Sequence, residues 1–161
     1  MEPQPLISPE PSLPLQANER STAMWMHLAP LVALFVNALI PIPLLSLITV
    51  GILYYTQKDK SAFVSRHGKE SLNFQITLFL VGVVMFIVVA LVFGGSILGL
   101  MAGGQGNLSE AGTVGLVGSG LALGGVALLL GVAVVVLLVM ATIRANNGQD
   151  YRYPVTLRLV K

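Results

Sequence analysis

Residues 63–75 read FVSRHGKESLNFQ and decide the fold, because this polar stretch leads directly into a long apolar run. The stretch contains Arg66, His67, Lys69 and Glu70, whereas residues 71–109 contain no charged side chain. A helix that crosses the hydrocarbon core of a bilayer needs about 20 predominantly apolar residues. The stretch therefore predicts the start of a membrane helix, with its polar end at the membrane surface.

The composition of the whole chain supports a membrane location. Charged residues make up 10% of the 161 residues and hydrophobic residues 55%, whereas soluble domains are about 25% charged. Residues 111–143 form a second run without charge. These features exclude a water-soluble fold and predict an integral α-helical membrane protein. The absence of cysteine excludes a disulfide framework, a Cys-ligated zinc site and a Cys nucleophile.

The N-terminal segment has a different composition. Five of the nine prolines lie in residues 1–20. Proline fixes φ and donates no backbone hydrogen bond, so we expect this segment to be a disordered leader. It lacks the basic region of a signal peptide. A membrane domain is predicted to follow, over residues 21–161.

Two prolines interrupt the first apolar region, which begins near Met24. The sequence Pro41-Ile42-Pro43 separates predicted helices over residues 22–40 and 44–56. Two topologies fit: one long kinked span with the N-terminus outside, or a hairpin of two short helices with the N-terminus inside. We favour the hairpin, because a break with two prolines is more natural in a turn.

The second half of the chain predicts two longer helices, over about residues 64–95 and 114–145. A glycine-rich link, residues 94–113, joins the two apolar runs. The sequence Asn146-Asn147-Gly148 indicates a helix end, and alternating apolar and polar residues then predict an extended tail over residues 146–161. The predicted fold is all-α: a membrane helical bundle of four helical segments, the first two short.

The basic residues are placed asymmetrically. Eight of the nine lie in residues 57–70 or in the tail from Arg144 onward, and none lies in the glycine-rich link. Cytoplasmic loops of membrane proteins are enriched in Lys and Arg, so both basic segments are predicted to be cytoplasmic. Predicted cytoplasmic surface or lipid-phosphate contacts are Lys58, Lys60, Arg66, Arg152 and Arg158. Predicted interfacial anchors are Trp25, Tyr55, Tyr151 and Tyr153.

A stripe of polar residues follows the start of the third predicted helix. Glu70, Asn73 and Thr77 are three or four residues apart and share one helix face. Polar side chains in a bilayer usually face the bundle interior. We expect Glu70 to approach Arg144, directly or through Asn73, since both lie near the cytoplasmic surface. The candidate buried polar cluster is His67, Lys69, Glu70, Asn73, Thr77 and Arg144.

The motifs of common enzymes do not fit. Residues 68–71 (GKES) lack the earlier glycine of a phosphate-binding loop, because Phe63 occupies its position. Residues 118–120 (GSG) have the wrong spacing for a nucleophile elbow. The two histidines form no HExxH motif, and no basic, aromatic-interleaved surface suggests nucleic acid. We therefore predict no catalytic residue, metal ligand, cofactor or nucleic-acid partner.

Two motifs carry a resemblance to a known family. Residues 67–75 (HGKESLNFQ), together with residues 143–148 (IRANNG) and 151–154 (YRYP), resemble the bacterial DUF4870 membrane proteins, which are Tic20-like. The resemblance covers roughly residues 20–161. It implies a small four-helix protein of the bacterial inner membrane, with both termini cytoplasmic.

Two functions are consistent with these observations. The first is a non-enzymatic helper or subunit in membrane protein transport or assembly, as the Tic20-like resemblance implies. The alternative is a small oligomeric channel or transporter that uses the polar stripe of the third helix. The expected partners are the lipid bilayer and either other membrane proteins or further copies of the chain.

Overall fold

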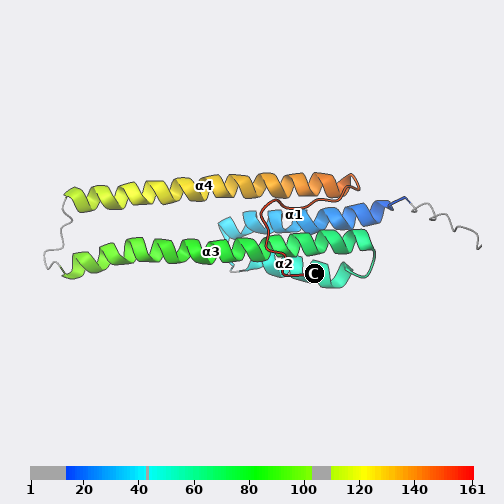
Figure 1. Cartoon of the computed structure of the whole chain (residues 1–161), viewed down its shortest axis with the longest axis horizontal. Helices are drawn as coiled ribbons and strands as arrows, with labels where there is room; N and C mark the ends of the chain where they lie inside the picture. Colours follow the sequence, from blue (N-terminus) through cyan, green and yellow to red (C-terminus); the bar gives the residue numbers. More distant parts are fainter. Residues whose placement is uncertain (1–13, 43, 103–109) are drawn as a thin grey trace, which may run out of the picture.

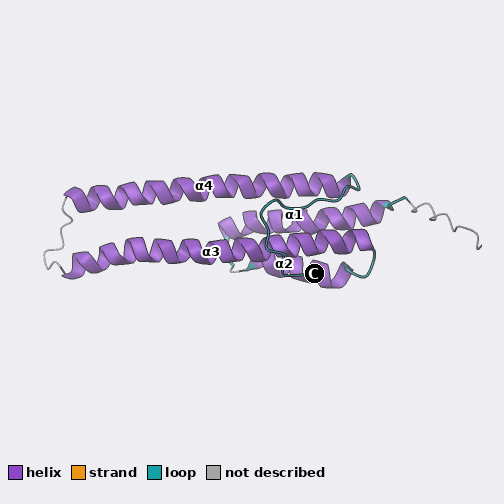
Figure 2. Ribbon diagram, viewed as in Figure 1, coloured by secondary structure: helices purple, strands orange, loops and turns teal. Residues whose placement is uncertain are grey.

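The computed structural model describes residues 14–42, 44–102 and 110–161. Within these residues the chain forms four helices and no strand: α1 (Ala17–Leu39), α2 (Leu45–Gln57), α3 (Ala62–Ala102) and α4 (Glu110–Asn146). Successive helices run in opposite directions, and the tail after α4 turns back across the bundle (Figure 1; Figure 2). The predicted all-α bundle of four helical segments with an extended tail is confirmed, but of the first two helices only α2 is short.

Three of the described helices, α1, α3 and α4, are long and apolar enough to cross a membrane, whereas α2 is a shorter apolar helix. The side chains in the apolar halves of α3 and α4 are mostly exposed, including Phe86, Leu91 and Leu129. Exposed apolar surface on this scale is stable in lipid and not in water. The chain is therefore a membrane protein in contact with the bilayer.

α1 and α2 form a hairpin, as predicted, and not one kinked span. The helix ends before Pro41, and the N–H group of Ile40 still donates to the carbonyl of Val36 at 2.8 Å. The side-chain oxygen of Asn37 accepts a hydrogen bond from the N–H group of Ile42 at 2.7 Å. Leu44 adopts a left-handed conformation with φ of 62° immediately before α2. Pro43 lies outside the described residues.

α1 starts earlier than the sequence predicted. It begins at Ala17, inside the segment that we expected to be a leader, whereas the predicted start was residue 22. Glu19 explains the extra turn, because its carboxylate accepts a hydrogen bond from the N–H group of Gln16 at 2.8 Å. The prediction of disorder for residues 1–13 lies outside the described residues.

α3 and α4 extend well past the α1–α2 hairpin (Figure 1). α3 has 41 residues and is therefore about 60 Å long, twice the hydrocarbon core of about 30 Å. It continues through Gly94 and Gly95 to Ala102, past the predicted end at residue 95. Glycine destabilises helices in water, but in lipid each backbone polar group must be hydrogen-bonded internally, which favours the helix.

The buried core lies at the end of the bundle where all four helices and the tail meet. It consists of three clusters, each joining different elements: Phe74, Leu138, Ala141 and Tyr153; Ala23, Phe63 and Ala145; and Val50, Tyr54 and Leu72. The first cluster joins α3, α4 and the tail, the second joins α1, α3 and α4, and the third joins α2 and α3. The polar start of α3 thus lies inside the most tightly packed part of the molecule.

Candidate functional site

The polar stripe of α3 holds the tail. The side-chain oxygen of Asn73 accepts hydrogen bonds from the N–H groups of Leu159 at 2.9 Å and of Val160 at 2.7 Å. Its amide nitrogen donates to the carbonyl of Val160 at 3.0 Å. One buried side chain therefore fixes two consecutive residues of an extended segment that has no sheet partner among the described residues.

Thr77 adds a second attachment one helical turn further along α3. Its hydroxyl oxygen accepts a hydrogen bond from the N–H group of Leu157 at 3.0 Å and donates to the carbonyl of Asn73 at 2.8 Å. Asn73 and Thr77 are both buried. Their polar groups are satisfied by the tail backbone and by α3 itself, so Asn73 and Thr77 attach the tail to α3.

Two histidines and a tyrosine form a buried hydrogen-bonded chain beneath the tail. The ring nitrogens of His27 contact the hydroxyl of Tyr153 at 2.8 Å and Nδ1 of His67 at 2.9 Å. Tyr153 belongs to the tail, His27 to α1 and His67 to α3, so these hydrogen bonds connect three elements. His27 was placed in no predicted site, because its partners Tyr153 and His67 are distant in sequence and no local pattern identifies them.

The sequence suggested that Tyr153 lies at the membrane interface, but its side chain is buried within the bundle. It is 2% exposed, and its ring stacks on Phe74 with 3.9 Å between ring centroids. Burial raises the pKa of Tyr153 well above its ordinary value, and the charges of Tyr151 and Glu70 act in the same direction. Alternation along the tail could not distinguish a surface tyrosine from one that inserts between helices.

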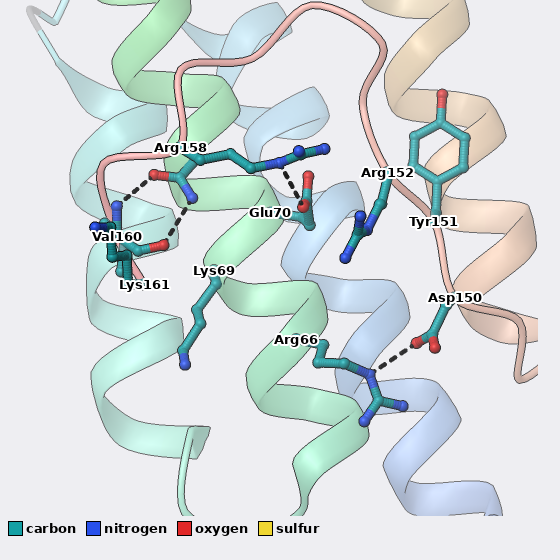
Figure 3. A pocket seen from close by; sticks show the side chains of 10 residues that line it. Arg66, Lys69, Glu70, Asp150, Tyr151, Arg152, Arg158, Val160 and Lys161 are labelled. Atoms are coloured by element: carbon teal, nitrogen blue, oxygen red, sulfur yellow. Dashed lines mark hydrogen bonds and ion pairs between the residues drawn. The ribbon is translucent and has the colours of Figure 1, made fainter.

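A basic hollow lies between the start of α3 and the tail (Figure 3). It has a volume of about 240 Å³ and contains five basic and two acidic side chains: Arg66, Lys69, Arg152, Arg158 and Lys161, with Glu70 and Asp150. Arg66 Nε pairs with Asp150 at 3.1 Å, and Arg158 Nε pairs with Glu70 at 3.6 Å. We refer to this feature as the basic hollow.

The expected approach of Glu70 to Arg144 is not what the structure shows, because the ion pair of Glu70 is with Arg158. Arg144 is exposed on α4. Burial raises the pKa of Tyr151, and the charge of Arg144 opposes this increase only in part. Charge asymmetry along the sequence gives the depth of a residue but not its direction around the helix. At this depth α1 packs against both α3 and α4 (Figure 1).

The remaining predicted residues are dispersed. Lys58 lies over the ring of Tyr55 at 5.5 Å from its centroid, and Lys60 lines a separate hollow near the start of α1. Trp25 and Tyr55 are 47% and 68% exposed, as suits interfacial side chains, while Tyr151 is partly buried. Of the lipid-phosphate candidates, Arg66, Arg152 and Arg158 are brought together in the basic hollow and Lys58 and Lys60 are not.

The charged and polar groups of the site can bind a ligand through charge and hydrogen bonds. The described residues contain no group of three or more His, Asp or Glu side chains placed to hold a metal ion. The imidazole Nε2 of His67 is 4.0 Å from Asp150 Oδ1, beyond hydrogen-bonding distance. The arrangement provides a fixed tail and a hollow with a surplus of positive charge.

The fold and the site define a multi-pass helical membrane protein with a basic, tail-covered end. The model of the magnetosome magnetite crystal formation protein family, MamF/MmsF, matches residues 18–160, and the chain belongs to this family. No curated protein and no solved structure matches the chain.

The family match corrects the resemblance to the DUF4870 and Tic20-like proteins, which was wrong. The residues that suggested it have packing roles. A Cβ atom on Gly68 would lie 2.6 Å from the ring of Tyr54, and Asn73 holds the tail. Motifs of this kind describe how the bundle is assembled and do not identify what it does. The transport role inferred from that resemblance has no support.

Proposed function

We propose that this chain is a non-enzymatic component of the magnetosome membrane that supports formation of the magnetite crystal. The observation that carries the proposal is the family match over residues 18–160, which spans all four helices and most of the tail. The site adds a physical argument. Asn73 and Thr77 are used to hold the tail, so these two polar side chains are not available as reacting groups or as the lining of a channel.

The proposed orientation places both termini and the basic hollow on the cytoplasmic side of a membrane derived from the inner membrane. Lys58 and Lys60 lie in and beside the α2–α3 connection, at the same end of the bundle as the start of the tail (Figure 1). The end of α3 at Ala102 and the start of α4 at Glu110 lie at the opposite end, and the intervening sequence 103–109 contains no basic residue. Under the positive-inside rule, that second end would face the crystal.

The charge distribution favours an indirect role in crystal formation. Between residues 71 and 143 the only charged side chain is that of Glu110. Hard metal cations bind preferentially to sites that combine several oxygen ligands, usually carboxylates. One carboxylate is a poor template for a mineral surface. The chain would therefore act by organising the membrane or its proteins around the crystal.

Gene replacement in the bacterium that carries this chain tests the proposal. Deletion should change the size or number of magnetite crystals in electron micrographs, and the wild-type gene should restore them. Glu110→Gln should restore crystals as well as the wild type does, because the role is indirect. Unchanged crystals after deletion would contradict the proposed function, and failure of Glu110→Gln alone would instead indicate direct contact with the mineral.

A further inference from the structure

We propose that the basic hollow binds a phosphate group, and that the phosphate belongs to the headgroup of an anionic phospholipid. The proposal concerns a ligand site that does not depend on a role in crystal formation. Its basis is the excess of cations around one half-open hollow: five basic side chains and two carboxylates line it, which leaves three positive charges in surplus.

The ion pairs show which cations remain available. Arg66 neutralises Asp150, and Arg158 neutralises Glu70. Lys69, Arg152 and Lys161 form no ion pair among the described residues, although all three line the hollow. In Figure 3, Lys69 and Arg152 lie on opposite sides of Glu70, and the Lys69 side chain extends away from Glu70.

The depth of the hollow along the bundle matches that of lipid headgroups. The carbonyl of Met26 accepts a hydrogen bond from the Ser71 hydroxyl at 2.5 Å, so the neighbouring Trp25 lies level with Ser71. The ring of Tyr54 packs on Gly68, so Tyr55 lies level with Gly68.

Trp25 and Tyr55 are both exposed, and exposed aromatic side chains of this kind mark the membrane interface. Lys69 and Glu70 lie between Gly68 and Ser71 on α3. The basic hollow is therefore at the height at which phospholipid phosphates lie.

The size and remaining polarity of the hollow fit a headgroup with a hydroxyl. Its volume is about 240 Å³, whereas a water molecule occupies about 30 Å³ in the liquid. A phosphate with a short polyol can be accommodated. The buried Oε2 atom of Glu70 has no hydrogen-bond partner among the described residues, and it would accept a hydrogen bond from a headgroup hydroxyl.

The test uses the full chain in nanodiscs or detergent and measures binding of fluorescent phosphatidylglycerol, with phosphatidylcholine and inorganic phosphate as separate probes. The variant Lys69→Gln with Arg152→Gln removes two unpaired cations from the hollow. The matched control, Lys58→Gln with Lys60→Gln, removes the same charge from outside it. Lys69 and Arg152 line the hollow and would bond the phosphate directly, whereas Lys58 and Lys60 do not line it. We therefore expect the first variant to bind phosphatidylglycerol roughly 30-fold more weakly, a loss of about 2 kcal/mol.

The control should change the affinity less than about twofold. Equal losses in both double variants, or no loss in either, would overturn the proposal. Tight binding of inorganic phosphate, with phosphatidylglycerol no better than phosphatidylcholine, would support a phosphate site but assign it to a soluble ligand and overturn the lipid assignment. The single variant Arg152→Gln, in the exposed tail, repeats the test if the double variant does not fold. None of these results depends on crystal formation.

Discussion

Gly68 shows how one residue sets the distance between two elements. The ring of Tyr54 from α2 lies directly over it, and an added Cβ would approach Cδ2 of that ring to 2.6 Å. Real Cβ atoms do not make such contacts, so either the ring or the helix would have to move. Gly82, on the same helix, has no atom within 4 Å of an added Cβ. The two glycines therefore form a matched pair.

We predict opposite effects for the two alanine substitutions. Gly68→Ala should lower the free energy of unfolding by about 1–3 kcal/mol, the usual cost of overpacking a filled site. Gly82→Ala should leave it unchanged or raise it by up to about 1 kcal/mol, because alanine favours the helix. Unfolding followed by circular dichroism in detergent measures both. Equal stability of the two variants would show that α2 does not pack tightly on α3.

Tyr153 shows what the sequence could not provide at the residue scale. Its position in an alternating tail with arginines suggested a membrane surface, but the side chain is buried between Phe74 and His27. The partners are far away in sequence, and no local pattern identifies them. The stripe of Asn73 and Thr77 was predictable, because helical spacing alone places them on one face.

At the element scale, the tail is held by contacts that can be removed one at a time. Thr77 accepts from Leu157, whereas Asn73 accepts from Leu159 and Val160. Thr77→Val should therefore accelerate hydrogen exchange at the Leu157 amide, with Leu159 and Val160 still protected. Asn73→Leu should accelerate exchange at Leu159 and Val160, because their donors lose their acceptor.

Amide exchange measured by nuclear magnetic resonance in detergent distinguishes these patterns. The amide of Ile40 donates to the carbonyl of Val36 and lies at the far end of the α1–α2 hairpin. Its protection from exchange therefore serves as an internal control. A uniform increase at all these amides would indicate general destabilisation and would contradict specific attachment of the tail to the polar stripe.

The helix boundaries show which physical signals are readable from sequence. The proline pair correctly predicted the break between α1 and α2. The predicted ends of α3 and α4 at the glycine-rich link were wrong, because the prediction relied on the low helix propensity that glycine has in water. In a bilayer the need for internal backbone hydrogen bonds outweighs a propensity penalty of about 1 kcal/mol per residue.

At the scale of the whole molecule, the fold class follows from composition and the packing does not. Three apolar segments of sufficient length define a membrane bundle, and the placement of basic residues gives each segment a depth. Neither feature reveals that α1 packs against both α3 and α4. Neither reveals that the ion pair of Glu70 is with Arg158 and not with Arg144. The family likewise came from a match along most of the chain and not from its short motifs.

The same asymmetry of charge makes a prediction about orientation. The chain contains no cysteine, so single variants Asp59→Cys and Gln105→Cys can be labelled without background. Asp59 is exposed in the α2–α3 connection, at the basic end. In a host that forms no magnetosomes, where the chain would lie in the inner membrane, a membrane-impermeant maleimide applied to intact spheroplasts should label Gln105→Cys and should reach Asp59→Cys only after permeabilisation. Labelling of both from the same side would contradict the positive-inside assignment, and would also place the basic hollow and the glycine-rich link on one face of the membrane.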